Sequence, residues 1–109
     1  MLIIESRGFD RPIVIIHPGE YYVCGKEHII STVLGSCIAV AMHDPKTEQG
    51  GINHFMLPGN ISRNYYQTDI GKYGIHAMEL LFNAMLKKGC GKDRLVVKVF
   101  GGGTILPSR

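Results

Sequence analysis

The segment that decides the fold reads Ile38-Ala39-Val40-Ala41-Met42, then Asp44-Pro45-Lys46-Thr47, then Gly51-Ile52-Asn53-His54-Phe55-Met56-Leu57. The first run is apolar at both odd and even positions, which predicts a strand that is buried on both faces. The second run has the composition of a type I turn. The third run predicts a returning strand that stops at Pro58-Gly59. Together these runs predict an antiparallel hairpin.

The geometry of this hairpin bears on Cys37 and His54. Opposed residues of an antiparallel pair have a constant sum of residue numbers, and a turn centred on Pro45 and Lys46 gives a sum of 91. The residue numbers of Cys37 and His54 also add up to 91. In this register their Cβ atoms would lie opposite each other at about 5 Å. Any odd sum keeps both side chains on one face, and an even sum separates them. A bulge at Gly50 or Gly51 would shift the register by one residue.

Other segments on both sides of the hairpin also predict regular structure. Strands are expected over residues 11–16, 27–33 and 95–100, because β-branched residues gather there and turn sequences follow. A helix is expected over residues 72–88, where apolar residues recur at three- and four-residue spacing, with Thr68 or Asp69 as its cap. Residues 60–71 are polar and predict a surface loop.

Composition limits the classes of protein that this chain belongs to. Its 109 residues, 45% of them hydrophobic, predict one domain with a real core. The net charge of +3 comes from interspersed charges, which argues against a nucleic-acid partner. The three cysteines do not form a secreted disulfide pattern, and residues 1–7 do not resemble a leader. No apolar run reaches the roughly 18 residues that span a bilayer. We therefore expect a reduced, cytoplasmic protein.

Cys37 and His54 are the candidate catalytic pair. A thiol attacks as its thiolate, and a neighbouring imidazole is the usual acceptor of the thiol proton at neutral pH. Taken singly, each residue is more often structural, since a cysteine that opens an apolar strand usually behaves as a small hydrophobe. The small residues Gly35 and Ser36, just before Cys37, would let a substrate carbonyl approach backbone N–H groups that stabilise an oxyanion.

The surrounding pattern resembles the CheD family of chemoreceptor glutamine deamidases. The resemblance is carried by residues 32–40, Asp44-Pro45, Gly50-Gly51 and residues 53–58, and it continues through the predicted helix to residues 98–102. It implies an α+β fold, a layered α/β arrangement with a β-sandwich core flanked by helices. Residues 1–109 would form a single CheD-like domain that lacks the family's C-terminal part.

The resemblance also implies roles for particular residues. Cys37 would be the nucleophile and His54 the base, and the family's hydroxyl residue falls on Ser31, with Thr32 as the alternative. Ser31 and Thr32 would point to opposite faces of a strand, so only one of them can orient the imidazole, and we favour Ser31. Further candidates for contacts to the oxyanion or the substrate are Gly35, Ser36, Thr32 and Asn53.

No cofactor or metal is expected. A zinc site built from Cys24, His28, Cys37 and His43 is the alternative, but the sequence has no C-x-x-C pair.

The implied activity is hydrolysis of glutamine side-chain amides on the cytoplasmic domain of chemotaxis receptors, through a cysteine thioester. The resemblance also names a CheC-type phosphatase as a partner. The competing interpretation is a noncatalytic adaptor that binds the receptor or this phosphatase. Strands left without their neighbours would expose edges that favour association.

Overall fold

The computed structural model describes residues 2–4, 10–56 and 69–101. These residues form strands β1 (Leu2–Ile4), β2 (Ile13–Ile15), β3 (Tyr21–Cys24), β4 (Ile29–Ser31), β5 (Ile38–Asp44), β6 (Gln49–Phe55) and β7 (Val96–Gly101), the helix α1 (Asp69–Lys87) and a short 3-10 helix, η2 (Lys92–Arg94). The predicted strands and helix are confirmed. The loop predicted over 60–71 lies outside the described residues up to residue 68, and residues 69–71 belong to α1.

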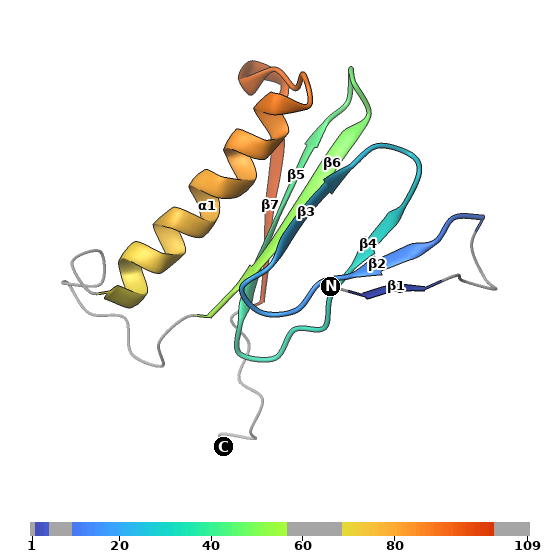
Figure 1. The fold of residues 1–109 in the computed structure, drawn as a ribbon. Coiled ribbons are helices and arrows are strands. Elements are labelled where there is room, and N and C mark those ends of the chain that lie inside the picture. Colours follow the sequence, from blue (N-terminus) through green and yellow to red (C-terminus); the bar gives the residue numbers. More distant parts are fainter. Residues whose placement is uncertain (1, 5–9, 57–68, 102–109) are drawn as a thin grey trace.

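The described strands form two sheets. A four-stranded antiparallel sheet has the order β3-β6-β5-β7, and a three-stranded sheet has the order β1-β2-β4, in which β2 and β4 are parallel. Figure 1 shows α1 on one side of the four-stranded sheet and the three-stranded sheet on the other. This arrangement agrees with the expected α+β fold. None of the helical segments in the described part of the chain has the length and hydropathy that crossing a bilayer requires.

The hairpin of β5 and β6 forms as predicted, but its register differs from the expected one. Ile38 pairs with Phe55 and Asp44 with Gln49, so the paired numbers sum to 93 instead of 91. The two-residue turn is replaced by a loop over residues 45–48. Asp44 causes this change, because its carboxylate accepts a hydrogen bond from Lys46 N–H at 2.9 Å and its carbonyl accepts one from Glu48 N–H at 2.8 Å. Glu48 closes the loop at a positive φ of 58°.

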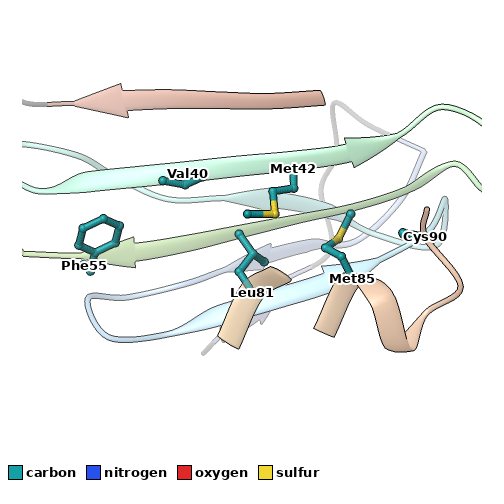
Figure 2. Packing of buried hydrophobic residues seen from close by; sticks show 6 residues of the cluster. All are labelled: Val40, Met42, Phe55, Leu81, Met85 and Cys90. Carbon is teal, nitrogen blue, oxygen red and sulfur yellow. The ribbon is translucent and has the colours of Figure 1, made fainter. Parts of the chain in front are cut away.

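Helix α1 packs mainly over β6 and β3. The core between the helix and the sheet consists of Val40, Met42, Phe55, Leu81, Met85 and Cys90 (Figure 2). Gly51 permits this close packing, because a Cβ there would lie 2.8 Å from Val23 Cγ2 and 2.9 Å from Leu81 Cδ1. The glycine in β6 therefore lets the helix approach the sheet and introduces no bulge.

Asp44 also fastens the hairpin to the segment that leads into β7. Its fully buried carboxylate accepts hydrogen bonds from Gly91 N–H at 2.9 Å and from the Arg94 guanidinium at 2.8 and 3.1 Å. The guanidinium holds the pKa of this carboxyl well below its usual range. Asp44 thus carries a charge throughout the ordinary pH range and fixes where β7 begins beside β5.

The packing of α1 yields a stability prediction. Replacing Leu81, which is 0% exposed, by alanine should lower the free energy of unfolding by about 2–5 kcal/mol, since a cavity would remain between helix and sheet. Leu80→Ala, at a neighbouring position that is 37% exposed, is the matched control and should cost much less. Urea unfolding of the two variants measures the difference. Equal losses would contradict the described packing.

Candidate active site

His54 is fixed on β6 by its backbone as well as by its side chain. Its N–H donates to Glu20 O at 3.1 Å, and its carbonyl accepts from Gly19 N–H at 2.7 Å. Both partners belong to the turn between β2 and β3. The residue is only 3% exposed, so its imidazole occupies one defined place between the two sheets.

The hydroxyl of Thr32 sets the tautomer of this imidazole. Thr32 Oγ1 lies 2.8 Å from Ile16 O and 2.8 Å from His54 Nδ1. A carbonyl only accepts, so the single hydroxyl proton goes to Ile16 O, and the hydroxyl must accept a proton from Nδ1. The neutral imidazole therefore carries its proton on Nδ1, and Nε2 keeps a free lone pair.

His54 Nε2 is the unusual atom of the site. It is buried and has no hydrogen-bond partner among the described residues. Burial lowers the pKa of His54, and the nearby His17 lowers it further. A buried polar atom without a partner is rare and marks a place where function is to be sought. The arrangement leaves a neutral imidazole with an unused basic nitrogen.

Cys37 differs from the other two cysteines in its exposure. Cys24 and Cys90 are buried, and their sulfur atoms lie near His28 O at 3.7 Å and Thr47 Oγ1 at 3.6 Å. Burial raises the pKa of the Cys24 thiol. Cys37 is partly exposed, in a bend at residues 35–37 that precedes β5. It is therefore the thiol that a substrate can reach.

The register relates Cys37 to His54. His54 is opposite Ala39, and Cys37 comes two residues before Ala39 and one before the first pair of the hairpin. The sum of 93 is odd, so if the strand continued to Cys37, this residue would lie on the same face as His54 and diagonal to it. The separation of the two positions would then be roughly 7 Å. The prediction that the two residues are directly opposed is wrong, because the four-residue loop after Asp44 changes the register. The thiol does not form a hydrogen bond to Nε2 in this structure.

The end of β7 holds the backbone of Cys37. Gly101 pairs with Ile38 and has a positive φ of 106°. A Cβ at Gly101 would collide with the carbonyl oxygen of Cys37. A glycine is therefore required for β7 to reach this point, and the close approach limits where the bend before β5 can lie.

The hydroxyl that contacts His54 belongs to Thr32 and not to Ser31, which the sequence analysis favoured. Ser31 ends β4, pairs with Ile15 and accepts a backbone hydrogen bond from Ile16 N–H. Thr32, one residue beyond the strand, turns its side chain toward the four-stranded sheet. The sequence pattern alone could not reveal which of the two hydroxyl residues contacts His54.

The other candidate residues divide into two groups. Gly35 and Ser36 are exposed in the bend beside Cys37. Asn53 lies on the opposite face of β6 from His54 and is 1% exposed. Its side chain accepts from Val40 N–H at 2.9 Å and donates to Ala77 O at 3.2 Å. It joins the sheet to α1 and does not face the imidazole.

Two participants have no signal in the sequence. The carbonyl of Ile16 directs the Thr32 hydroxyl, and backbone atoms leave no trace in composition. His17, in the turn after β2, is close enough to influence His54 electrostatically. Finding either one would have required knowing which distant residues lie close together in the folded chain. For the described residues, no group of three metal-ligating side chains lies together.

The Thr32 contact predicts the behaviour of His54 in solution. Thr32→Val keeps the shape of the side chain but removes the hydroxyl, so the neutral imidazole should lose its preference for a proton on Nδ1. Thr32→Ser and Ser31→Ala should both keep that preference. Nitrogen-15 NMR of labelled histidine reads the tautomer directly. In the unsubstituted protein, the same spectra should show protonation of His54 at a pH below the usual value of about 6.5.

The opposite pattern would contradict this geometry. If Ser31→Ala changed the nitrogen signals of His54 and Thr32→Val left them unchanged, Ser31 would be the orienting residue.

Comparisons with known proteins give consistent matches. A family model described as CheD chemotactic sensory transduction matches residues 56–109. The curated protein "Probable chemoreceptor glutamine deamidase CheD 2" of Shewanella oneidensis is 44% identical over 106 residues, which cover 94% of this chain and 52% of that protein. "Probable chemoreceptor glutamine deamidase CheD 1" of the same organism is 48% identical over 102 residues, 93% of this chain and 50% of that protein.

A third relative, "Probable chemoreceptor glutamine deamidase CheD" of Cupriavidus pinatubonensis, is 45% identical over 104 residues, 93% of this chain and 48% of that protein. The chain spans about half the length of these curated relatives. The family model and the relatives agree, and the relatives align with nearly all of this sequence, so the chain is similar to the CheD family over nearly its whole length.

Proposed function

We propose that this chain is a cysteine-dependent deamidase that converts glutamine side chains of chemotaxis receptors to glutamate. The relatives' names supply the substrate class. The observation that carries the proposal is the buried, unpartnered Nε2 of His54, whose lone pair is directed by the Thr32 hydroxyl. Such a nitrogen is suited to take a proton from a thiol. The substrate would be the receptor's cytoplasmic domain, and the chain would act in the cytoplasm.

The first step is activation of Cys37. His54 Nε2 takes the thiol proton, and the resulting thiolate attacks the carboxamide carbon of the substrate glutamine. The carbonyl oxygen becomes an oxyanion as the carbon becomes tetrahedral. Backbone N–H groups near Ser36 and Cys37, which lie before the paired part of β5, would stabilise it.

The later steps return the site to its starting state. The imidazolium gives the proton on Nε2 to the leaving nitrogen, the carbon–nitrogen bond breaks, and ammonia departs from a thioester. His54 then takes a proton from water, whose oxygen attacks the thioester. Glutamate is released with its new oxygen, and Cys37 recovers its proton. Thr32 acts as a positioning residue throughout, because its hydroxyl keeps Nδ1 protonated and Nε2 free.

This mechanism requires a movement of the bend at residues 35–37. The thiol and Nε2 do not form a hydrogen bond in the structure, so the bend would have to bring them together transiently in the free protein as well as in the complex with substrate. His54 is held by its backbone and by Thr32. The exposed bend is therefore the part that would move, and the imidazole would stay fixed.

A noncatalytic adaptor is the second candidate function. The absence of the thiol-to-imidazole hydrogen bond favours it, because a chain that only binds needs no such contact. Its partner would be the receptor or a CheC-type phosphatase. Activity on a receptor substrate separates the two candidates.

Substitution at Cys37 tests the proposal. Cys37→Ala should reduce conversion of receptor glutamine to the uncatalysed level, and His54→Ala should reduce it by about a hundredfold or more. Cys24→Ala removes a buried thiol far from His54 and is the matched control, with conversion largely kept. Mass spectrometry of receptor peptides detects the replacement of the amide by a carboxyl group.

Two results would count against a cysteine deamidase. Conversion by Cys37→Ala at the rate of the unsubstituted chain would exclude the nucleophile. If the unsubstituted chain bound the receptor but converted no glutamine, the noncatalytic adaptor would be the remaining candidate function.

A further inference from the structure

Two exposed apolar side chains lie beside the reactive groups of the candidate site. Val33 directly follows Thr32, and Met56 follows the end of β6, two residues after His54. Val33 is 84% exposed, which is the largest exposed fraction among the large apolar residues that the structure describes, and Met56 is 58% exposed. Phe55, between His54 and Met56, is instead buried in the core under α1. Val33 and Met56 together are called the apolar rim below.

The covalent chain keeps the apolar rim close to the imidazole. Consecutive Cα atoms are about 3.8 Å apart, and the Thr32 hydroxyl lies 2.8 Å from His54 Nδ1. Both rim residues therefore have their Cα atoms within roughly 10 Å of the imidazole. They also come from different layers, because Val33 follows a strand of the three-stranded sheet and Met56 follows β6 of the four-stranded one. A polypeptide that brings a glutamine to this site would come near both.

The segments that carry the rim are uncharged. Residues 32–42 and 50–59 contain no aspartate, glutamate, lysine or arginine, although these four types make up 19% of the chain. Charged groups approach His54 in the turn before β3, where His17 Nδ1 and Glu20 Oε1 face each other at 3.5 Å. A charge that lay against Val33 or Met56 would thus lose water without gaining an opposite charge from these two segments.

Single exposed apolar side chains are common on protein surfaces and need no special explanation. The apolar rim differs because its two members lie beside one site, come from two layers and belong to uncharged segments. Resting on the deamidase function proposed above, we propose that the rim selects which glutamine is converted. Val33 and Met56 are specificity-determining residues that bind uncharged, apolar side chains next to the substrate glutamine. A glutamine with charged neighbours is then a poor substrate.

Two synthetic peptides test this selection. Each carries one glutamine in the same flexible sequence, and the residues on both sides of the glutamine are leucines in one peptide and aspartates in the other. The unsubstituted chain should convert the leucine peptide with a kcat/KM at least about tenfold higher, because leucine gains from burial against the rim and aspartate does not. Mass spectrometry detects the glutamate that forms.

Substitutions in the rim should remove the preference. Val33→Ser and Met56→Gln should each lower kcat/KM for the leucine peptide at least about fivefold, mainly through KM, and change it little for the aspartate peptide. Ile75→Ser is the matched control, since Ile75 is 43% exposed on α1, across the sheet from His54, and it should keep the preference. Unchanged nitrogen-15 signals of His54 in the rim variants would show that the imidazole itself is undisturbed.

Binding by the Cys37→Ala chain separates this inference from the deamidase proposal, because that chain lacks the thiol. Titration calorimetry should show tighter binding of the leucine peptide, and adding Val33→Ser should abolish the difference. Equal binding of the two peptides, or a preference that both rim variants keep, would overturn the inference while conversion by the unsubstituted chain still supported the deamidase. A preference in binding without any conversion would refute the deamidase alone.

The oligomeric state supplies a further test of the apolar rim. The unsubstituted chain should have the mass of one copy by light scattering. A doubled mass that Val33→Ser or Met56→Gln restored to one copy would overturn the inference, because a second copy of this chain would then cover the rim.

Discussion

The hydrogen bond between His54 Nδ1 and Thr32 Oγ1 is the interaction on which the candidate site depends. It joins the two sheets, because Thr32 follows a strand of the three-stranded sheet and His54 lies in the four-stranded one. The second hydrogen bond of the hydroxyl, to Ile16 O, decides the direction of the first. The way the layers pack therefore determines which nitrogen of the imidazole is basic, and a change in that packing would alter the chemistry as well as the stability.

The other half of the site depends on a different set of contacts. Cys37 precedes β5, whose far end is fixed by the Asp44 carboxylate and its ties to Gly91 and Arg94. Those ties place β7 beside β5, and the end of β7 at Gly101 lies against the backbone of Cys37. The backbone of Cys37 thus lies in an exposed bend whose position is limited by the end of β7.

Much of the fold could be predicted from local patterns, because the hairpin and α1 have strong periodicities. The register could not, since it depends on how Asp44 bonds to its own loop. The paired residue numbers sum to 93 instead of 91, which places Ala39, and not Cys37, opposite His54. Likewise, the family resemblance implies a hydroxyl residue at position 31 or 32, but only the packing of the two sheets selects Thr32. The spacing of residues along the sequence does not reveal which residues contact each other across two packed layers.

The central claim is that Nε2 of His54 accepts the proton of the Cys37 thiol. Alkylation by iodoacetamide at neutral pH tests it most directly, because thiolate reacts and thiol does not, and Cys24 and Cys90 are buried. The account predicts that Cys37 is labelled at least about tenfold faster in the unsubstituted chain than in His54→Gln, with equal rates once the pH is high enough to ionise any thiol. Equal labelling rates of the two proteins at neutral pH would contradict it.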